Sequence, residues 1–301
     1  MLACQHGWED LLSKLIIEKV DVNRQNRQGI SALYIASEQG HHQLVKILFT
    51  AKADANIRTN CVPAMYVASI SDHFEVVQAL IEAQAEVDIQ ENSGESPLYI
   101  ASQNGHSKVV ELLIRGHANV NCRKNTGCSS LYIASHNGHS LVVEMLIKAC
   151  KSQSKHRFVT SLYTAAQNGH CQVHQQTVTL VVELLIKAKA DVNLQEASDG
   201  WSPLSVASLK GHYRVVQLLI DAQADVNLTI NSGKSPLYIA SQYGSPLVLG
   251  LLVKAQAVVN STTNTHLHPI LISAQNGHHQ IVELLLTPEV LSNCRHCCKP
   301  H

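Results

Sequence analysis

One short sequence recurs along the whole chain at a nearly constant spacing. Residues 96–114 return in almost the same form at residues 235–253. The position of Tyr99 is occupied in successive copies by Tyr34, Tyr66, Tyr99, Tyr132, Tyr163, Ser205, Tyr238 and Leu271, at steps of 32, 33, 33, 31, 42, 33 and 33 residues. Such a period is typical of a solenoid, because each unit is too small to bury its own apolar face and must stack on its neighbours. We therefore expect a row of similar stacked units.

Each unit reads as two short helices followed by a turn. Ser96 can cap a helix that has Pro97 at its first position, and Gly105 can adopt the left-handed conformation that ends it. The apolar residues within 109–114 predict a second helix. Helices this short are marginal alone, so their stability must come from stacking. Asn and Gly within residues 118–127 predict a projecting turn before the next unit.

These features resemble a known family. The period, Ser-Pro-Leu at 96–98, Val-Val-Glu-Leu-Leu at 109–113 and Ala-Asp-Val-Asn at 190–193 and 224–227 are similar to ankyrin repeats. The resemblance implies an all-α solenoid of stacked helix-turn-helix units with projecting β-turn or hairpin loops over residues 1–290. About eight repeats are expected after a truncated first one, near residues 1–25, 26–58, 59–90, 91–123, 124–154, 155–195, 196–228, 229–261 and 262–290.

One position departs from the family pattern. The family usually has His after Pro-Leu, whereas this chain has Tyr at six of eight such positions. We expect a row of mostly buried Tyr rings with a structural role, each phenol hydroxyl needing a partner.

Three irregularities interrupt the repeat. The turn before Leu162 is two residues short, and residues 171–178 have no counterpart in the other units. We expect that insertion to bulge from the junction between two helices. A surplus residue lies near Asp199. The incomplete first unit and the apolar last one suggest a segment of a longer array, and residues 291–301, a Cys- and His-containing tail, are expected to be disordered.

Composition excludes several classes of function. Lys plus Arg and Asp plus Glu each total 23, so no net positive charge favours nucleic acid. No stretch approaches the roughly 18 apolar residues of a membrane span, and the start does not resemble a secretory signal. Six of the nine cysteines are scattered without paired spacing and the odd total leaves at least one thiol unpaired, which fits reduced thiols. We expect a protein of the cytoplasm, with the nucleus as a second location, that does not insert into membranes.

Candidate chemical sites are weak. Six units carry Gly-His at the end of the first helix, but one His per repeat cannot converge on one metal ion. The tail pairs Cys294 with Cys297 near two His residues, which is one short motif and insufficient for a metal or lipid site. Residues 232–235, Ser-Gly-Lys-Ser, imitate part of a phosphate loop but read as a hairpin turn. We therefore expect no metal, no cofactor and no catalytic activity.

Ankyrin repeats, as a family, are protein–protein interaction modules. The first hypothesis is a non-catalytic scaffold or adaptor that binds a protein of unknown identity through a concave groove and hairpin tips, as a monomer or as part of a longer array. The alternative is the targeting or substrate-recognition segment of a longer multidomain enzyme, such as a ubiquitin ligase or kinase.

Variable positions suggest where a partner would bind. The residue after each turn glycine is expected at a hairpin tip and is often apolar. Trp201 is the aromatic residue of that series, although packing against the next tip would equally explain it. Together with inner-helix positions that depart from the common Gln-Asn pair, the candidate partner-binding residues are Ile30, Val62, Trp201, Leu209, Lys210, Lys234, Tyr243 and Leu267.

Overall fold

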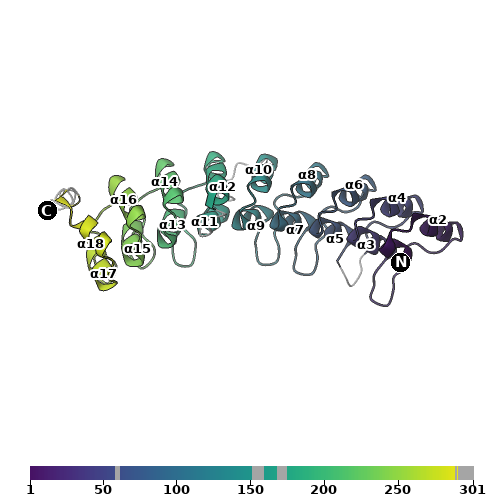
Figure 1. Cartoon of the computed structure of the whole chain (residues 1–301), viewed down its shortest axis with the longest axis horizontal. Coiled ribbons are helices and arrows are strands. Elements are labelled where there is room, and N and C mark those ends of the chain that lie inside the picture. Colours follow the sequence, from purple (N-terminus) through teal and green to yellow (C-terminus); the bar gives the residue numbers. More distant parts are fainter. Residues whose placement is uncertain (58–61, 151–158, 168–174, 289, 291–301) are drawn as a thin grey trace. The chain divides into compact units, whose positions relative to one another are not determined.

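The protein is a chain of helix pairs. A computed structural model describes residues 1–57, 62–150, 159–167, 175–288 and 290, and within them it contains 18 helices and no extended strand. Figure 1 shows the pairs in chain order. The chain divides into two compact units, Met1–Ser152 and Gln153–His301.

The first unit holds five helix pairs. They are α1 (Leu2–His6) with α2 (Glu9–Ile17), α3 (Ala32–Glu38) with α4 (His42–Thr50), α5 (Ala64–Ile70) with α6 (Phe74–Glu82), α7 (Pro97–Asn104) with α8 (Ser107–Arg115), and α9 (Ser130–Asn137) with α10 (Ser140–Ala149). The first helices of successive pairs pack on one another, and so do the second helices. We call the first helix of each pair the inner helix and the second the outer helix.

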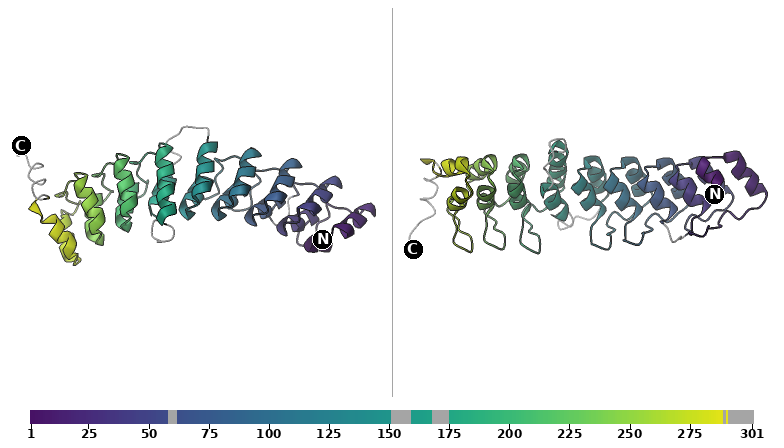
Figure 2. Two further views of the ribbon diagram at one scale, coloured as in Figure 1. Left: turned by 45° about the horizontal axis from the view of Figure 1, so that its top comes forward. Right: turned by 60° about the horizontal axis from the view of Figure 1, so that its bottom comes forward.

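The second unit holds four pairs. They are α11 (Val159–Gln167) with α12 (Gln175–Lys187), α13 (Pro203–Lys210) with α14 (Tyr213–Asp221), α15 (Pro236–Tyr243) with α16 (Pro246–Lys254), and α17 (Pro269–Gln275) with α18 (His279–Leu285). The same two rows of helices form here. Within each unit the loops between repeats project from the side of the inner helices (Figure 2). This arrangement confirms the all-α solenoid expected from the 33-residue period.

The inner helices begin and end where the sequence predicts. The Ser96 hydroxyl accepts a hydrogen bond from the Tyr99 backbone N–H at 3.1 Å, Pro97 is the first helical residue, and Gly105 ends α7 with φ of 77°. Serine caps α3, α9, α13 and α15 in the same way. Local sequence therefore sets the start and end of these helices.

Small and branched apolar residues form the core between the rows. Ala101 of α7 is fully buried, which allows close approach of neighbouring helices, and Val109, Val110 and Leu113 of α8 are equally buried. Fully burying one such Val or Leu side chain contributes about 1.5–3 kcal/mol. Because every helix pair repeats this pattern, the core runs continuously along the stacked pairs of each compact unit rather than forming one central cluster.

Side chains also connect successive repeats. The ring Nε2 of His139 lies 2.9 Å from the backbone oxygen of Gln103, one repeat earlier, and the amide of Asn137 donates to the same oxygen at 2.8 Å. Equivalent imidazole contacts to a backbone oxygen involve His73, His106, His212 and His278. Four of the six Gly-His pairs, at His106, His139, His212 and His278, therefore tie repeats together, as does His73, which follows Asp72.

The insertion within 171–178 differs from expectation. Gln175–Lys187 form a single helix, so the last four inserted residues lengthen the outer helix α12 instead of bulging from the junction. Val178 packs at 2 % exposure, which explains the helical extension: its side chain is buried against the stack. The rest of the insertion, most of the shortened turn and the C-terminal tail lie outside the described residues.

Two smaller predictions are confirmed. In the hairpin near Asp199, the Glu196 N–H donates to the Trp201 oxygen, which spans one residue more than the Ile230-to-Lys234 bond of the next hairpin. The extra residue is accommodated because the Glu196 carboxylate accepts the Ser198 and Asp199 backbone N–H groups. Residues 232–235 form a turn, in which Gly233 has φ of 78°.

Candidate partner-binding face

The row of Tyr residues lies on the inner helices, one per repeat. Tyr66, Tyr99 and Tyr238 are buried, whereas Leu271 at the same position is 54 % exposed. Burial is the main reason that the pKa of each of these three phenols is raised. The row therefore has a structural role wherever its rings are buried.

A charged cluster links three repeats of the first unit. The Tyr66 hydroxyl donates to the Glu95 carboxylate at 2.9 Å, and the Lys124 ammonium donates to the same carboxylate at 3.2 Å. Lys124 also lies 5.0 Å from the centre of the Tyr99 ring. Its hydrogen bonds to Tyr99 and Glu95 raise the pKa of Lys124.

Sequence reasoning missed this cluster. Glu95 and Lys124 belong to successive hairpins, and the repeat register alone does not show that their side chains meet. The sequence did contain a signal that could have predicted the cluster, namely opposite charges in neighbouring hairpins, each close to a Tyr of the row. In this cluster Glu95, the residue after the turn glycine Gly94, faces the Tyr of the preceding repeat.

In the hairpins that the structure describes, the candidate residue that follows the turn glycine, or follows His266 in the case of Leu267, closes the base of the hairpin rather than forming its tip. The Ile30 oxygen accepts a hydrogen bond from the Asn26 N–H, the Lys234 oxygen from Ile230, and the Leu267 oxygen from Thr263. The tips lie two or three residues earlier. Ile30, Val62, Trp201 and Lys234 are half-buried and Leu267 is 37 % exposed, so packing accounts for part of their apolar character.

Trp201 lies where the Tyr row is interrupted. Ser205, the Tyr equivalent of that repeat, is buried and forms a reciprocal capping pair with Ser202: each side-chain oxygen accepts from the other residue's backbone N–H. The small Ser205 side chain leaves Trp201 as the aromatic residue at this end of the inner helix. Within the described residues no hydrogen bond engages the Trp201 indole N–H.

Lys234 extends along the inner helix of its own repeat. Its ammonium donates to the Gln242 side-chain oxygen at 3.1 Å and lies 5.8 Å from the centre of the Tyr238 ring. Near the other end of these helices, Tyr243 is 54 % exposed and Leu209 and Lys210 are half-buried. Lys210 and Tyr243 replace the Asn that elsewhere ties two repeats together, as Asn276 does to the Gln242 oxygen at 2.8 Å.

The family follows from comparison with known proteins. The family model of ankyrin repeats in three copies matches residues 1–91, 64–157 and 162–263. The chain belongs to the ankyrin repeat family. No curated protein matches it. Ankyrin repeats are generally protein–protein interaction modules, and they are typically non-catalytic.

The candidate partner-binding residues of this ankyrin array lie in both compact units. Ile30 and Val62 belong to the first unit. Six residues lie on the inner helices and hairpin bases of the second: Trp201, Leu209, Lys210, Lys234, Tyr243 and Leu267. The inner helices that carry or follow these six residues are neighbours, since α13 packs on α15 and α15 on α17, and we refer to the six together as the Trp201 face. No helix in the described part of the chain is long and apolar enough to span a membrane.

Proposed function

We propose that this ankyrin array is a non-catalytic scaffold or adaptor that binds a protein partner through the Trp201 face. Solenoids use their extended surfaces for recognition rather than for chemistry. Ile30 and Val62 would contribute a second contact area on the first unit. Among the described residues, Cys4, Cys122, Cys128 and Cys150 are free thiols, which supports a cytoplasmic or nuclear location.

The state of Trp201 is the observation that carries the proposal. Its ring is only half-buried, and within the described residues its N–H group lacks a hydrogen-bond partner. Trp is enriched among the few residues that dominate binding energy, because a partner can bury the ring and accept the N–H hydrogen bond together. Tyr243 and Leu267 add exposed apolar area on the same face.

Charge indicates the chemistry of the partner. The inner helices of the second unit contain no Asp or Glu, while Lys210 and Lys234 supply positive charge. A segment that presents apolar side chains next to carboxylates fits this face best. If the chain is instead the targeting segment of a longer enzyme, the same face would bind the substrate, so the prediction for Trp201 does not change.

The two Trp residues of the chain provide a matched test. Trp8 lies in the first unit, is 51 % exposed and stacks on the His6 ring with 4.8 Å between ring centres. A partner captured from lysate with the full chain should lose about 2 kcal/mol or more of binding energy with Trp201→Ala, or about thirtyfold in affinity, and little with Trp8→Ala. The melting temperature should stay nearly unchanged.

The opposite result has a clear meaning. If Trp201→Ala lowered the melting temperature while the folded variant bound the partner with unchanged affinity, Trp201 would be a packing residue and the Trp201 face would not be the binding centre.

A further inference from the structure

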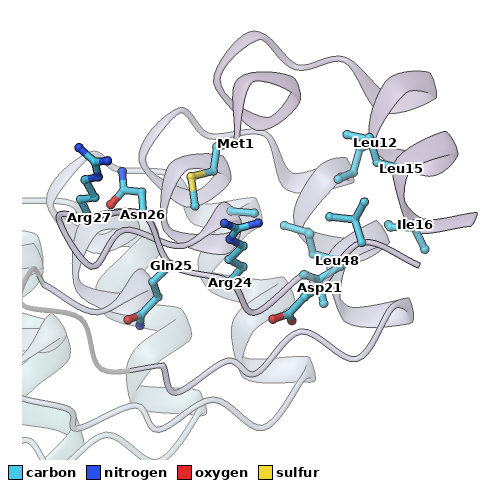
Figure 3. A pocket seen from close by; sticks show the side chains of 13 residues that line it. Met1, Leu12, Leu15, Ile16, Asp21, Arg24, Gln25, Asn26, Arg27 and Leu48 are labelled. Atoms are coloured by element: carbon cyan, nitrogen blue, oxygen red, sulfur yellow. The ribbon is translucent and has the colours of Figure 1, made fainter. Parts of the chain in front are cut away.

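The first unit contains a cavity that the proposed function does not use. It has a volume of about 460 Å³ and lies between α2, the loop over residues 20–27 and the helices α3 and α4. Pockets of roughly 300–1,000 Å³ are typical of small-molecule sites. Figure 3 shows Met1, Leu12, Leu15, Ile16 and Leu48 around it, with Arg24 and Arg27 on one side.

The apolar part of the cavity has a fixed floor and an open wall. Leu12 and Leu48 are at most 5 % exposed, so the core of the repeats holds them in place. Leu15 and Ile16 are half-buried, and Val20 is 50 % exposed. Later repeats have a buried Ala at the Val20 position: Ala85, Ala118, Ala190, Ala224 and Ala257. An aliphatic group of moderate length would cover this wall.

Two arginines provide charge at the other side. Arg24 and Arg27 are exposed, and within the described residues no hydrogen bond or ion pair engages either guanidinium. Arg27 occupies the position where Asn125, Asn231 and Asn264 donate to an oxygen of the preceding hairpin.

The other polar groups of the lining are occupied. The Asn26 side-chain oxygen accepts from the Gln28 and Ile30 backbone N–H groups, each at 2.9 Å, and Asp21 accepts from the Asn23 N–H at 3.0 Å. With Arg24 and Arg27 positive and Asp21 negative, the side chains of the lining carry one net positive charge.

We propose that this cavity binds an aliphatic carboxylate of the fatty-acid class. The chain lies along Leu12, Leu15, Ile16 and Val20, and the carboxylate accepts hydrogen bonds from the two guanidinium groups, which suit its planar geometry. The single net positive charge of the lining side chains matches the single negative charge of a carboxylate. The proposal is independent of partner binding by the Trp201 face, which lies in the other unit.

Decanoate and decanol separate the two halves of the site, because they share the chain and differ in the charged head. Calorimetric titration of the full chain below the concentration at which decanoate aggregates should show decanoate binding more tightly than decanol. The double variant Arg24→Gln with Arg27→Gln should lower the affinity for decanoate by about fivefold or more and leave the affinity for decanol unchanged. Added salt should weaken the binding of decanoate but not the binding of decanol.

Two variants control the experiment. Val20→Trp places a large ring in the cavity at an exposed position and should abolish binding of both compounds while the fold is kept. Lys46→Gln removes an exposed positive charge of the same unit outside the cavity and should change neither affinity.

Three binding results would overturn the proposal: equal affinity for decanoate and decanol, decanoate binding that survives Val20→Trp, or no binding of decanoate. A change in oligomeric state with Val20→Trp would instead assign the cavity to contact with a second copy of the chain, which also overturns it.

Discussion

Tyr66 donates its phenolic hydrogen to Glu95 across the boundary between two repeats. The contact shows how a Tyr can serve where the family usually has His: the ring is buried between helices and the hydroxyl finds a partner on the next hairpin. Where the row carries Ser205, the hydroxyl caps its own helix instead, and where it carries Leu271 the side chain is exposed. One repeat position therefore has three different uses.

The raised pKa of Tyr66 predicts that the protein loses stability at alkaline pH. Burial, together with the hydrogen bond to Glu95, raises the pKa of Tyr66, whereas an unfolded Tyr titrates near 10. Its contribution is therefore complete below a pH of about 10 and is lost as the pH rises through the folded pKa. The melting temperature of Tyr66→Phe should fall less than that of the unchanged protein between pH of about 9 and 11.

At neutral pH the same variant should be less stable by about 1 kcal/mol, the usual contribution of one hydrogen bond. Tyr132→Phe is the control, since within the described residues its hydroxyl makes no hydrogen bond. Identical pH profiles for Tyr66→Phe and the unchanged protein would show that the Glu95 contact does not contribute to stability.

The hairpins are the elements that join neighbouring repeats outside the helical core. Asn125 donates its side-chain N–H to the Asn92 oxygen at 3.1 Å, and its backbone N–H bonds the Ser93 oxygen at 3.1 Å. Asn231 and Asn264 repeat this contact in the second unit. Each hairpin is therefore held by the next one, and a hairpin glycine meets that neighbour closely.

Substitutions at Gly94 and Gly127 distinguish the cost of backbone strain from the cost of crowding against the next hairpin. Both have a left-handed conformation, with φ of 82° and 85°. A side-chain carbon at Gly94 would collide with the Asn125 side chain and lie 2.8 Å from its backbone nitrogen, whereas one at Gly127 would meet nothing within 4 Å among the residues that the structure describes. Gly127→Ala should cost about 1 kcal/mol and Gly94→Ala at least about twice that.

Chemical denaturation of both variants measures the two costs, and hydrogen exchange at the Asn125 amide shows whether the contact between hairpins is lost. Equal costs for the two variants would mean that the hairpins move apart without penalty and do not stabilise the array.

At the scale of the whole molecule, stability is distributed along each stack. Each inner helix packs on the inner helices before and after it in its unit, and each outer helix does the same. Such a chain behaves as a sum of repeat stabilities and nearest-neighbour contacts. A lesion in one repeat should therefore be felt mainly by the adjacent repeats of the same unit.

Leu219 and Leu113 test that expectation as a matched pair. Both are fully buried at the same position of an outer helix, Leu219 in α14 and Leu113 in α8. Leu219→Ala should cost about 2–5 kcal/mol and lower hydrogen-exchange protection in α12–α16 while leaving α3–α6 unchanged. Leu113→Ala should instead lower protection in α6–α10 and leave α12–α16 unchanged. Uniform loss of protection along the chain in both variants would contradict it and indicate one cooperative fold.

The sequence alone was sufficient for the family, the helix starts at Ser96 and its equivalents, the helix end at Gly105 and the surplus residue near Asp199. All of these depend on groups a few residues apart, and the 33-residue period multiplies each signal along the chain. The two candidate functions and the Trp201 face also come from sequence, and they remain proposals.

Tertiary structure decided whatever depends on side chains from different repeats. It placed Ile30, Trp201 and Lys234 at hairpin bases, joined Tyr66 to Glu95, and turned the end of the insertion into helix because Val178 is buried. It also formed the cavity beside Arg24, whose lining comes from four separate segments. A repeat pattern gives the register of such residues but not the direction of their side chains, and packing between neighbours selects that direction.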